Sequence, residues 1–275
     1  MIEILKSIFY GIVEGITEWL PISSTGHLIL LEELIPFSNV SENFFEMYEV
    51  VIQLGAILAV VVLFWNQIFP FSFKKEEKFI KMDIMTLWFK ILVACVPAAV
   101  IGILFDEYLD KLFYRCEVVA AALIIFGIAF IIIENWNKTK SAKITTLADI
   151  TYTTAALIGI FQVIAAVFPG TSRSGATIVG ALLIGVSRTV AAEFTFFLAI
   201  PVMFGASLLK LVSFGFSFTS MEAIALSVGM FTAFIVSLLV IRFLMTYIKK
   251  HDFKIFGWYR IVLGILVLVL FPILT

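Results

Sequence analysis

Long apolar stretches alternate with short polar ones along this chain of 275 residues. Six of the apolar stretches are long enough to cross a bilayer as helices, since a crossing helix needs about 20 residues. The strands of an outer-membrane barrel are roughly half as long and alternate in polarity, which these stretches do not. The pattern predicts transmembrane helices at residues 46–69, 86–105, 117–135, 190–210, 222–247 and 257–274.

Two further apolar segments, at about residues 5–35 and 152–185, are each interrupted by a proline and a loop rich in hydroxyl groups. A shift of 148 positions brings Gly11 onto Gly159, Glu14 onto Gln162, Pro21 onto Pro169 and Ser24 onto Ser172. Helices broken at corresponding places in two halves of a membrane protein point to its binding site. We therefore expect two re-entrant helix hairpins whose loops hold the functional groups.

Lysines gather in the loops at one side of the predicted helices, which the positive-inside rule assigns to the cytoplasm. They are Lys74, Lys75, Lys78, Lys81, Lys138, Lys140, Lys143, Lys249, Lys250 and Lys254. Because each half has one hairpin and an odd number of crossing helices, the second half enters from the opposite side. We predict a single membrane domain, 1–275, made of a first repeat (1–135) and an inverted second repeat (152–275). The first hairpin then opens to the outside and the second to the inside.

Composition agrees with a membrane protein, because 62% of the residues are hydrophobic, only 14% are charged and the mean hydropathy is +1.11. A soluble domain of this length needs far more polar surface. The net charge of −1 and the absence of a basic cluster give no indication of nucleic-acid binding. Cys95 and Cys116 are far apart in or beside apolar segments; we expect neither a disulfide nor a metal site there.

Glu14 and Glu18 are four residues apart in an otherwise apolar helix, so both carboxylates lie on one face. Such a pair must be neutralised by protons, by an arginine or by a divalent cation. Mg²⁺ is commonly held by one or two carboxylates, with water and substrate phosphate completing its shell. The pair therefore predicts a Mg²⁺ or Ca²⁺ site, although a helix-end carboxylate reaching the interface would give the same pattern.

The first loop contains Ser23, Ser24, Thr25 and His27, and hydroxyl and backbone N–H groups of this kind can cradle a phosphate. Ser24 and His27 are three residues apart, which suits a nucleophile and its base, but a hydroxyl cluster can also simply cap the next helix. Gln53, four residues after Glu49 near the outer end of the first full helix, could add a ligand to this loop; Glu49 could equally be an interfacial carboxylate.

The second loop places Arg173 among Ser172, Ser174 and Thr177. An arginine at membrane depth needs an anionic partner, and its planar fork fits phosphate. A structural salt bridge to Glu14 or Glu18 is the alternative, and the two can coexist before substrate arrives. Arg188, by contrast, is expected to anchor a helix end.

The segments Val13-Glu-Gly-Ile-Thr-Glu-Trp-Leu-Pro-Ile-Ser-Ser-Thr-Gly-His27 and Pro169-Gly-Thr-Ser-Arg-Ser-Gly-Ala-Thr177 resemble the two motifs of the bacterial undecaprenyl-diphosphate phosphatase family, which is also known for bacitracin resistance. The likeness covers essentially the whole chain. It implies an all-α, multi-pass enzyme of the bacterial plasma membrane that removes the terminal phosphate of undecaprenyl diphosphate, so that the lipid carrier returns to peptidoglycan synthesis. It also implies a divalent-metal requirement and two re-entrant hairpins meeting in one site, and it leaves a homodimer open.

Carried over by position, the family's acidic motif falls on Glu14 and Glu18, its serine–histidine pair on Ser24 and His27, and its arginine on Arg173. The nucleophile stays open between Ser24 and a water activated by Glu18 or His27. A secondary transporter or lipid flippase is the competing hypothesis, because broken helices in inverted repeats are typical of transporters. Two carboxylates, a serine–histidine pair and an arginine are more than anion transport requires, which favours hydrolysis.

Overall fold

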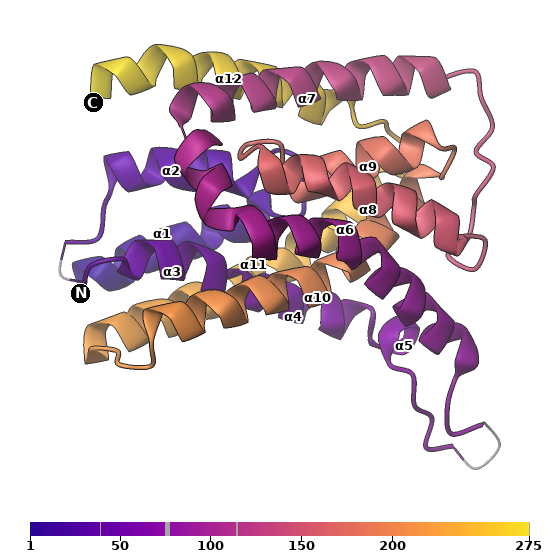
Figure 1. Ribbon diagram of the computed structural model, residues 1–275, viewed down its shortest axis with the longest axis horizontal. Coiled ribbons are helices and arrows are strands. Elements are labelled where there is room, and N and C mark those ends of the chain that lie inside the picture. The colour runs from indigo at the N-terminus through magenta and orange to yellow at the C-terminus, as the bar shows by residue number, and fades with distance from the viewer. Residues whose placement is uncertain (39, 75–77, 114, 275) are drawn as a thin grey trace.

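The computed structural model describes residues 1–38, 40–74, 78–113 and 115–274, and all side chains within these ranges except those of 106, 107, 110 and 270–274. Apart from two isolated bridges, the regular structure of these residues is entirely helical (Figure 1). The helices are α1 (Ile2–Thr17), α2 (Ser24–Leu34), α3 (Phe44–Val51), α4 (Gln53–Leu63), α5 (Trp65–Ile68), α6 (Met82–Phe113), α7 (Cys116–Asn137), α8 (Tyr152–Val167), α9 (Arg173–Leu183), α10 (Arg188–Phe214), α11 (Ser220–Tyr247) and α12 (Lys254–Leu274).

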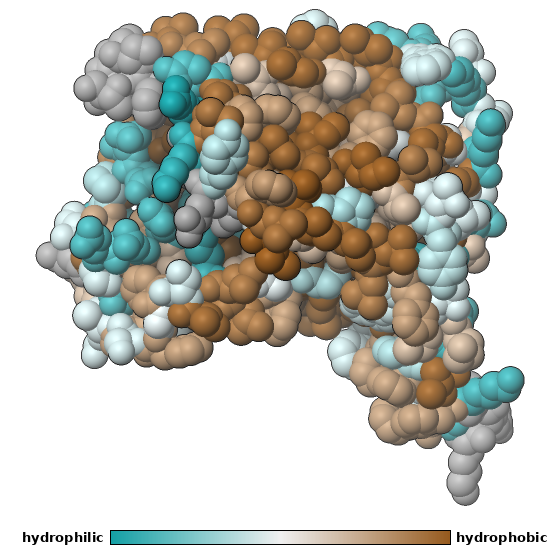
Figure 2. Space-filling model, viewed as in Figure 1, coloured by the Kyte–Doolittle hydropathy of each residue, from teal (hydrophilic) through white to brown (hydrophobic). Residues whose placement is uncertain are grey.

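Within the described residues, five helical stretches are long and apolar enough to cross a membrane: Phe44–Leu63, Met82–Phe105, Cys116–Asn137, Arg188–Phe214 and Ser220–Tyr247. They overlap five of the six predicted crossing helices, and α12 covers the remaining range. Apolar side chains form a broad surface between two more polar ends, as Figure 2 shows. The chain is therefore an all-helical, multi-pass membrane protein.

The first predicted crossing helix, 46–69, is not continuous, because the chain divides there into α3, α4 and α5. The backbone of Phe64 leaves the helical region (φ −112°, ψ 20°) and ends α4. Its ring packs edge-on against Phe197 of α10, with the ring centroids 5.3 Å apart. The break therefore lies where α4 packs against α10, a contact that the local apolar pattern does not encode.

Helix pairs far apart in sequence pack along one another: α1 with α11, α8 with α6, and α7 with α12. Glycines allow the first two pairs to approach backbone to backbone. A Cβ added to Gly11 of α1 would lie 2.6 Å from the Gly229 carbonyl oxygen, and one added to Gly159 of α8 would lie 2.3 Å from the Ala94 carbonyl oxygen. Small residues at helix contacts are the usual device for close packing in membranes.

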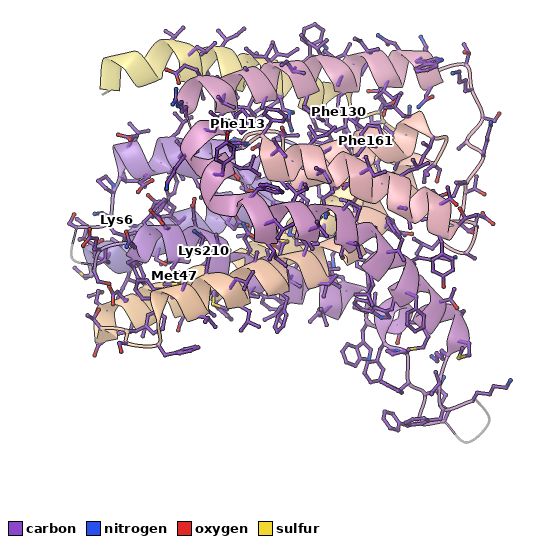
Figure 3. The ribbon with its side chains drawn as sticks, in the orientation of Figure 1. Lys6, Met47, Phe113, Phe130, Phe161 and Lys210 are labelled. Atoms are coloured by element: carbon purple, nitrogen blue, oxygen red, sulfur yellow. The ribbon has the colours of Figure 1, made fainter. Side chains whose placement is uncertain are left out.

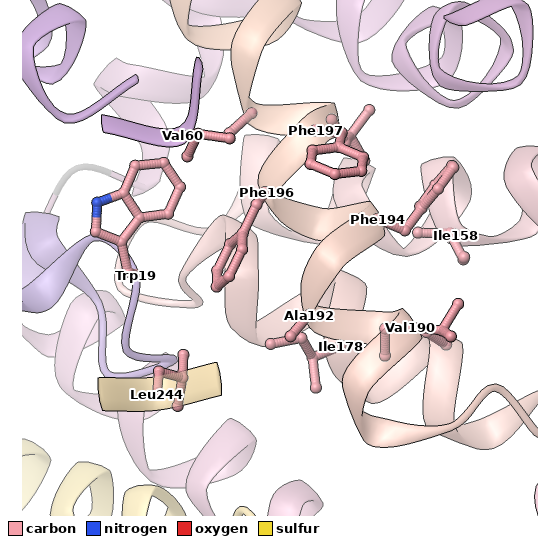
Figure 4. Close-up of a cluster of buried hydrophobic side chains, with 14 of the residues drawn as sticks. Trp19, Val60, Ile158, Ile178, Val190, Ala192, Phe194, Phe196, Phe197 and Leu244 are labelled. Atoms are coloured by element: carbon pink, nitrogen blue, oxygen red, sulfur yellow. The ribbon is translucent and has the colours of Figure 1, made fainter. Parts of the chain in front are cut away.

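A buried apolar cluster fixes the first interrupted segment against α10 (Figure 4). Trp19, which follows α1, is fully buried and meets the Phe196 ring edge-on at a centroid distance of 5.3 Å. Because Phe194, Phe196 and Phe197 are also fully buried, this part of α10 forms a rigid wall beside the loops that follow α1 and α8.

The second interrupted segment is held in a similar way. Phe161 of α8 presses on α9 at Gly180, where an added Cβ would lie 2.4 Å from the ring. Phe113 at the end of α6 contacts Phe168, with the ring centroids 4.9 Å apart. Figure 3 labels Phe161 and Phe113 near the middle of the molecule. Both interrupted segments are therefore packed on neighbouring helices.

Both chain termini lie at one end of the helix bundle, on the left in Figure 1. Lys6 lies at this end, labelled in Figure 3, and donates hydrogen bonds to the Pro36 carbonyl oxygen (2.5 Å) and the Ser38 hydroxyl (3.2 Å). The loop segments 138–151, 69–74 and 78–81 lie at the opposite end and carry most of the lysines that predict the cytoplasmic side. Lys75, one of those lysines, lies outside the described residues.

Candidate active site

Each interrupted segment is a pair of helices joined by a short loop, and α2 and α9, which follow the loops, each have 11 residues. In Figure 1, α2 runs from the middle of the molecule towards the end with the termini, whereas α9 runs towards the opposite end. The N-termini of both helices thus lie near the middle. Unpaired N–H groups and the positive end of the helix dipole make such termini suitable for binding an anion.

The two loops have the same capping geometry. Ser23 caps α2 by accepting a hydrogen bond from the Gly26 N–H (3.3 Å), and Ser172 caps α9 by accepting one from the Gly175 N–H (3.2 Å). Both serines have positive φ, 76° and 69° respectively, a conformation that non-glycine residues rarely adopt. Such strain persists where the surrounding structure enforces it, commonly at functional sites.

This geometry corrects the sequence alignment after the prolines. By capping role Ser172 corresponds to Ser23, not to Ser24, because the second loop has one more residue between its proline and its cap. Glycine at position 170 allows the longer loop to form, because the φ of Gly170 is +88° and an added Cβ would lie 2.6 Å from the Val119 carbonyl oxygen. The position equivalent to Ser24 is therefore Arg173.

Hydrogen bonds join the two loops through Glu18. Arg173 donates to one Glu18 carboxylate oxygen at 3.0 Å, and the Ser24 hydroxyl donates to the other at 2.7 Å. Arg173 also donates to the Thr195 carbonyl oxygen at 2.9 Å, which orients its guanidinium against α10. A serine hydroxyl held on a carboxylate has a proton acceptor in place, so Glu18 can act as the general base for Ser24.

Of the two carboxylates weighed as the salt-bridge partner of Arg173, Glu18 is the one that pairs with it. The other hydroxyls of the second loop support this arrangement. Ser174 donates to the Glu18 backbone carbonyl oxygen (3.3 Å), and its hydroxyl is hydrogen-bonded to that of Ser172 (3.1 Å). Thr177 donates to the Arg173 carbonyl oxygen at 2.9 Å.

His27 and Ser24 are not hydrogen-bonded to each other in this structure. The Ser23 carbonyl oxygen can only accept, so its 2.7 Å contact identifies Nδ1 of His27 as the protonated nitrogen. Nε2 then accepts a hydrogen bond from the Tyr259 hydroxyl at 2.7 Å, and the two rings stack with an interplanar angle of 9°. His27 is therefore held with an acceptor nitrogen towards α12.

Arg260, the residue after Tyr259, binds both loops at once. It is fully buried and donates to the carbonyl oxygens of Pro21 (3.2 Å), Gly170 (3.0 Å) and Thr171 (2.7 Å). No carboxylate of the described residues forms an ion pair with it. Arg260 consequently holds the loops together and adds an uncompensated positive charge to this part of the protein.

Buried polar atoms without a hydrogen-bond partner are concentrated in the two interrupted segments. Among the described side chains, all of these atoms belong to Glu14, Trp19, Gln162, Thr171 and Arg173. Neither carboxylate oxygen of Glu14 has a partner, and neither polar atom of the Gln162 amide has one. Leaving such groups unpaired is costly, so their clustering indicates a site that binds polar ligands or water.

The predicted metal ligands differ in their surroundings. Glu18 is engaged by Arg173 and Ser24, whereas both Glu14 oxygens are free to coordinate. The described residues hold no group of three or more His, Cys, Asp or Glu side chains that could enclose a metal. A Mg²⁺ ion that keeps several waters and binds substrate phosphate needs only one or two carboxylates, so the donor set fits such an ion.

Comparison with known proteins places the chain among relatives of the same length. A family model described as bacitracin resistance protein BacA matches residues 7–266. The chain belongs to this family. Among its relatives, it is 66% identical to an undecaprenyl-diphosphatase of Enterococcus faecalis over 98% of this chain and 97% of that one. It is 65% identical to undecaprenyl-diphosphatase 1 of Clostridium acetobutylicum, over 99% and 98% of the two chains.

For this member of the BacA family, sequence reasoning located the loops but missed Tyr259, Arg260 and the Thr195 carbonyl. Tyr259 and Arg260 lie in a predicted crossing helix, and an arginine inside such a helix was the available signal. Gln162 was aligned with Glu14 but was not considered a site residue. Gln53, predicted to bind substrate, is half-buried at the start of α4, and no hydrogen bond in the described residues joins it to the loops.

Proposed function

We propose that this protein is a membrane-embedded phosphatase that hydrolyses undecaprenyl diphosphate to undecaprenyl phosphate and phosphate. Membership of the BacA family and relatives named undecaprenyl-diphosphatase at 63–66% identity over nearly the whole chain support this assignment. The reaction returns the lipid carrier to peptidoglycan synthesis and accounts for bacitracin resistance. The observation that carries it is the cluster of unpaired buried polar groups around Arg173 and Glu14.

In the proposed site, the diphosphate lies between the N-termini of α2 and α9. Arg173 contacts the terminal phosphoryl group through donors that Glu18 and Thr195 leave unused, its Nε among them. The N–H groups of the first turns of both helices stabilise charge on the equatorial oxygens. Ser23, Thr25, Ser172 and Ser174 lie beside these N–H groups and complete the polar lining.

We propose Ser24 as the nucleophile. Its Oγ attacks the terminal phosphorus while its proton passes to the Glu18 carboxylate 2.7 Å away. The bond to the bridging oxygen breaks as Glu18 gives this proton to the departing oxygen, which releases undecaprenyl phosphate and leaves Glu18 ionised. Water then attacks the phosphoserine and gives its proton to ionised Glu18, or to Nε2 of His27 once that nitrogen gives up its hydrogen bond from Tyr259. The Oγ–P bond breaks, Ser24 recovers a proton from the same group, and phosphate leaves. Direct attack by water oriented by the same two groups is the alternative, and it leaves Ser24 with a binding role only.

Glu14 and Glu18 would hold a divalent cation, which would supply positive charge to offset the charge of the diphosphate. The free oxygens of Glu14 support this role. Arg173 and the loop N–H groups act on the same phosphoryl group from the side of the second hairpin.

We further propose that α12 is the sixth crossing helix, that the two interrupted segments are re-entrant hairpins, and that the halves form an inverted repeat. Three features support this. The pair α1–α11 has its counterpart in α8–α6, with Gly11 and Gly159 in matching roles. The caps Ser23 and Ser172 share one unusual conformation. Both termini lie at one end, as an even number of crossings requires (Figure 1).

Phosphate release from the purified protein tests the function. We expect undecaprenyl diphosphate to yield one phosphate per molecule and Ser24→Ala to abolish turnover. Substantial turnover by Ser24→Ala would assign the attack to water while keeping the phosphatase. Movement of undecaprenyl diphosphate across an intact bilayer without any phosphate release would replace the phosphatase by the transporter, the function that broken helices alone would suggest.

The active site is proposed to open to the outer face of the plasma membrane, and single cysteines can test this. Thr25 is only half-buried, so a Thr25→Cys variant in a background lacking Cys95 and Cys116 should react with an impermeant thiol reagent in right-side-out vesicles. Ser141→Cys, in an exposed loop at the lysine-rich end, is the matched control and should react only from the other side. The opposite labelling pattern would reverse the proposed orientation.

A further inference from the structure

A polar cavity lies at the lysine-rich end of the molecule, away from the loops that hold Ser24 and Arg173. Its volume is about 790 Å³, and it is lined by the end of α7, the loop after it, the α9–α10 turn and the end of α11. The inner wall consists of buried Glu134, Leu182, Val186 and Ile248. We call this cavity the basic cleft.

Cations dominate the lining of the basic cleft, because Lys140, Lys143, Arg188 and Lys249 face a single carboxylate, Glu134. Glu134 is already neutralised. Arg188 donates to it from both Nε (2.9 Å) and a terminal nitrogen, and the Phe253 N–H donates to it at 3.0 Å. Glu134 therefore does not balance the positive charges of the three lysines.

No described carboxylate forms an ion pair with these lysines. Asp252 is paired with Lys254 at 3.2 Å, and Glu193 of α10 interacts with Lys249 only at longer range. Lys140 lies over the Trp136 ring, 3.8 Å from its centroid, which leaves its charge uncompensated. The cleft is consequently positive, with exposed lysines on its rim and a buried inner wall.

The backbone adds hydrogen-bond donors at the same place. Helix α10 begins at Arg188 behind its cap Ser187, and Ser187, Arg188 and Thr189 all line the cleft. The first N–H groups of a helix have no acceptor within it, and the helix dipole places partial positive charge there. With the lysines, these donors form the arrangement that binds phosphate groups.

Two exposed apolar side chains mark the cleft as interfacial. Trp136 is 55% exposed beside Lys140, and Leu183 on the lining is 41% exposed. Tryptophan and lysine side by side at the end of a crossing helix are typical of the membrane–water boundary. A phosphate bound there can therefore carry acyl chains that continue along the apolar surface of α7.

We propose that the basic cleft binds the phosphate group of an anionic lipid of the inner leaflet. The cleft is separate from the phosphatase site, because Leu182, which lines the cleft, is nine residues after Arg173 in α9, a distance of about 14 Å along a helix. Free inorganic phosphate offers the same chemistry, and the experiment distinguishes the two sources. The binding does not depend on the proposed hydrolysis.

The test compares two double variants of the full chain in detergent. Lys143→Gln with Lys249→Gln removes two charges from the cleft. Lys138→Gln with Lys250→Gln removes two from neighbouring exposed positions outside its lining. Native mass spectrometry measures retention of phosphatidylglycerol against phosphatidylcholine, and equilibrium dialysis measures binding of labelled inorganic phosphate. Phosphate release from undecaprenyl diphosphate should be unchanged in both variants, because none of these lysines lies at the catalytic loops.

We expect the cleft variant to bind phosphatidylglycerol at least about tenfold more weakly, because each lysine near an anionic lipid contributes about fivefold. The control variant should resemble the unaltered protein, and raised salt should reduce the difference. If the cleft variant binds inorganic phosphate more weakly but binds phosphatidylglycerol as the control does, the cleft is a site for a free phosphate ion and the lipid is excluded. Equal binding of both probes by the two variants would overturn the proposal, whether or not the protein hydrolyses the diphosphate.

Discussion

Replacement of Arg260 by lysine tests whether the two loops must be held together for turnover. The guanidinium reaches Pro21 on the first loop and both Gly170 and Thr171 on the second, at 2.7–3.2 Å. Lysine keeps the charge but has one nitrogen on a flexible stem and lacks the rigid fork that spans two groups. Arg260→Lys can therefore hold one loop, but not both in their present positions.

The magnitude follows from the hydrogen bonds that are lost. A hydrogen bond from a charged donor contributes about 1.5–3 kcal/mol, so release of one loop corresponds to about 10- to 100-fold in rate if the contact persists in the transition state. A displacement of about 1 Å at a catalytic group has a similar cost. The loss should appear in kcat, with KM nearly unchanged, because the donors of Arg260 face backbone carbonyls and not the substrate.

Steady-state phosphate release, measured at equal amounts of folded protein, gives both constants. Arg242→Lys is the matched control, since Arg242 is exposed on α11 away from the loops. Arg260→Ala should lose more activity, and free guanidinium should restore part of it by occupying the vacated position. A kcat for Arg260→Lys within twofold of the control, or an effect confined to melting temperature, would refute the positioning role.

Three further outcomes follow from the same contacts. Arg173→Lys should lose most activity, because one ammonium cannot contact Glu18, the α10 backbone and phosphate together; near-normal phosphate release would make the arginine structural only. Chelation should stop hydrolysis and added Mg²⁺ or Ca²⁺ should restore it, with Glu14→Gln requiring about tenfold more metal; full activity in excess chelator would exclude the proposed cation. Tyr259→Phe removes one hydrogen bond to His27 and should lower kcat by about tenfold or less; an unchanged rate would show that the orientation of Nε2 has no catalytic role.

The helices and the two interruptions could be predicted because their signals are local. Apolar runs bounded by charged loops gave ranges that α6, α7, α10 and α11 overlap, and Pro21 and Pro169 marked the loops. The lysine pattern likewise needs no knowledge of packing. The break at Phe64 could not be predicted, because no proline or glycine marks it and Phe64 contacts a helix more than a hundred residues away in the sequence.

The missing parts of the site depend on tertiary packing. The sequence places Arg260 inside a predicted crossing helix but does not show what it contacts, and the packing of α12 on α7 and on both loops buries it fully. The contact between Ser24 and Glu18 also arises after folding, when the loop returns the hydroxyl to the end of α1. Spacing of three residues suggested His27 as the partner of Ser24, but the serine lies at the first position of α2 and its hydroxyl faces Glu18 instead.

In the proposed inverted repeat, matching backbone positions carry unlike side chains. Glu14 corresponds to Gln162 before the loops, and Ser24 corresponds to Arg173 directly after the caps. The first hairpin thus contributes the carboxylates and the hydroxyl, whereas the second contributes the cation. Two converging helix N-termini and the charge of Arg260 attract an anion from either half. Phosphoryl transfer needs an attacking group on one side and charge stabilisation on the other. If the proposed inverted repeat is correct, the unlike residues at its matching positions supply these two functions from the two halves.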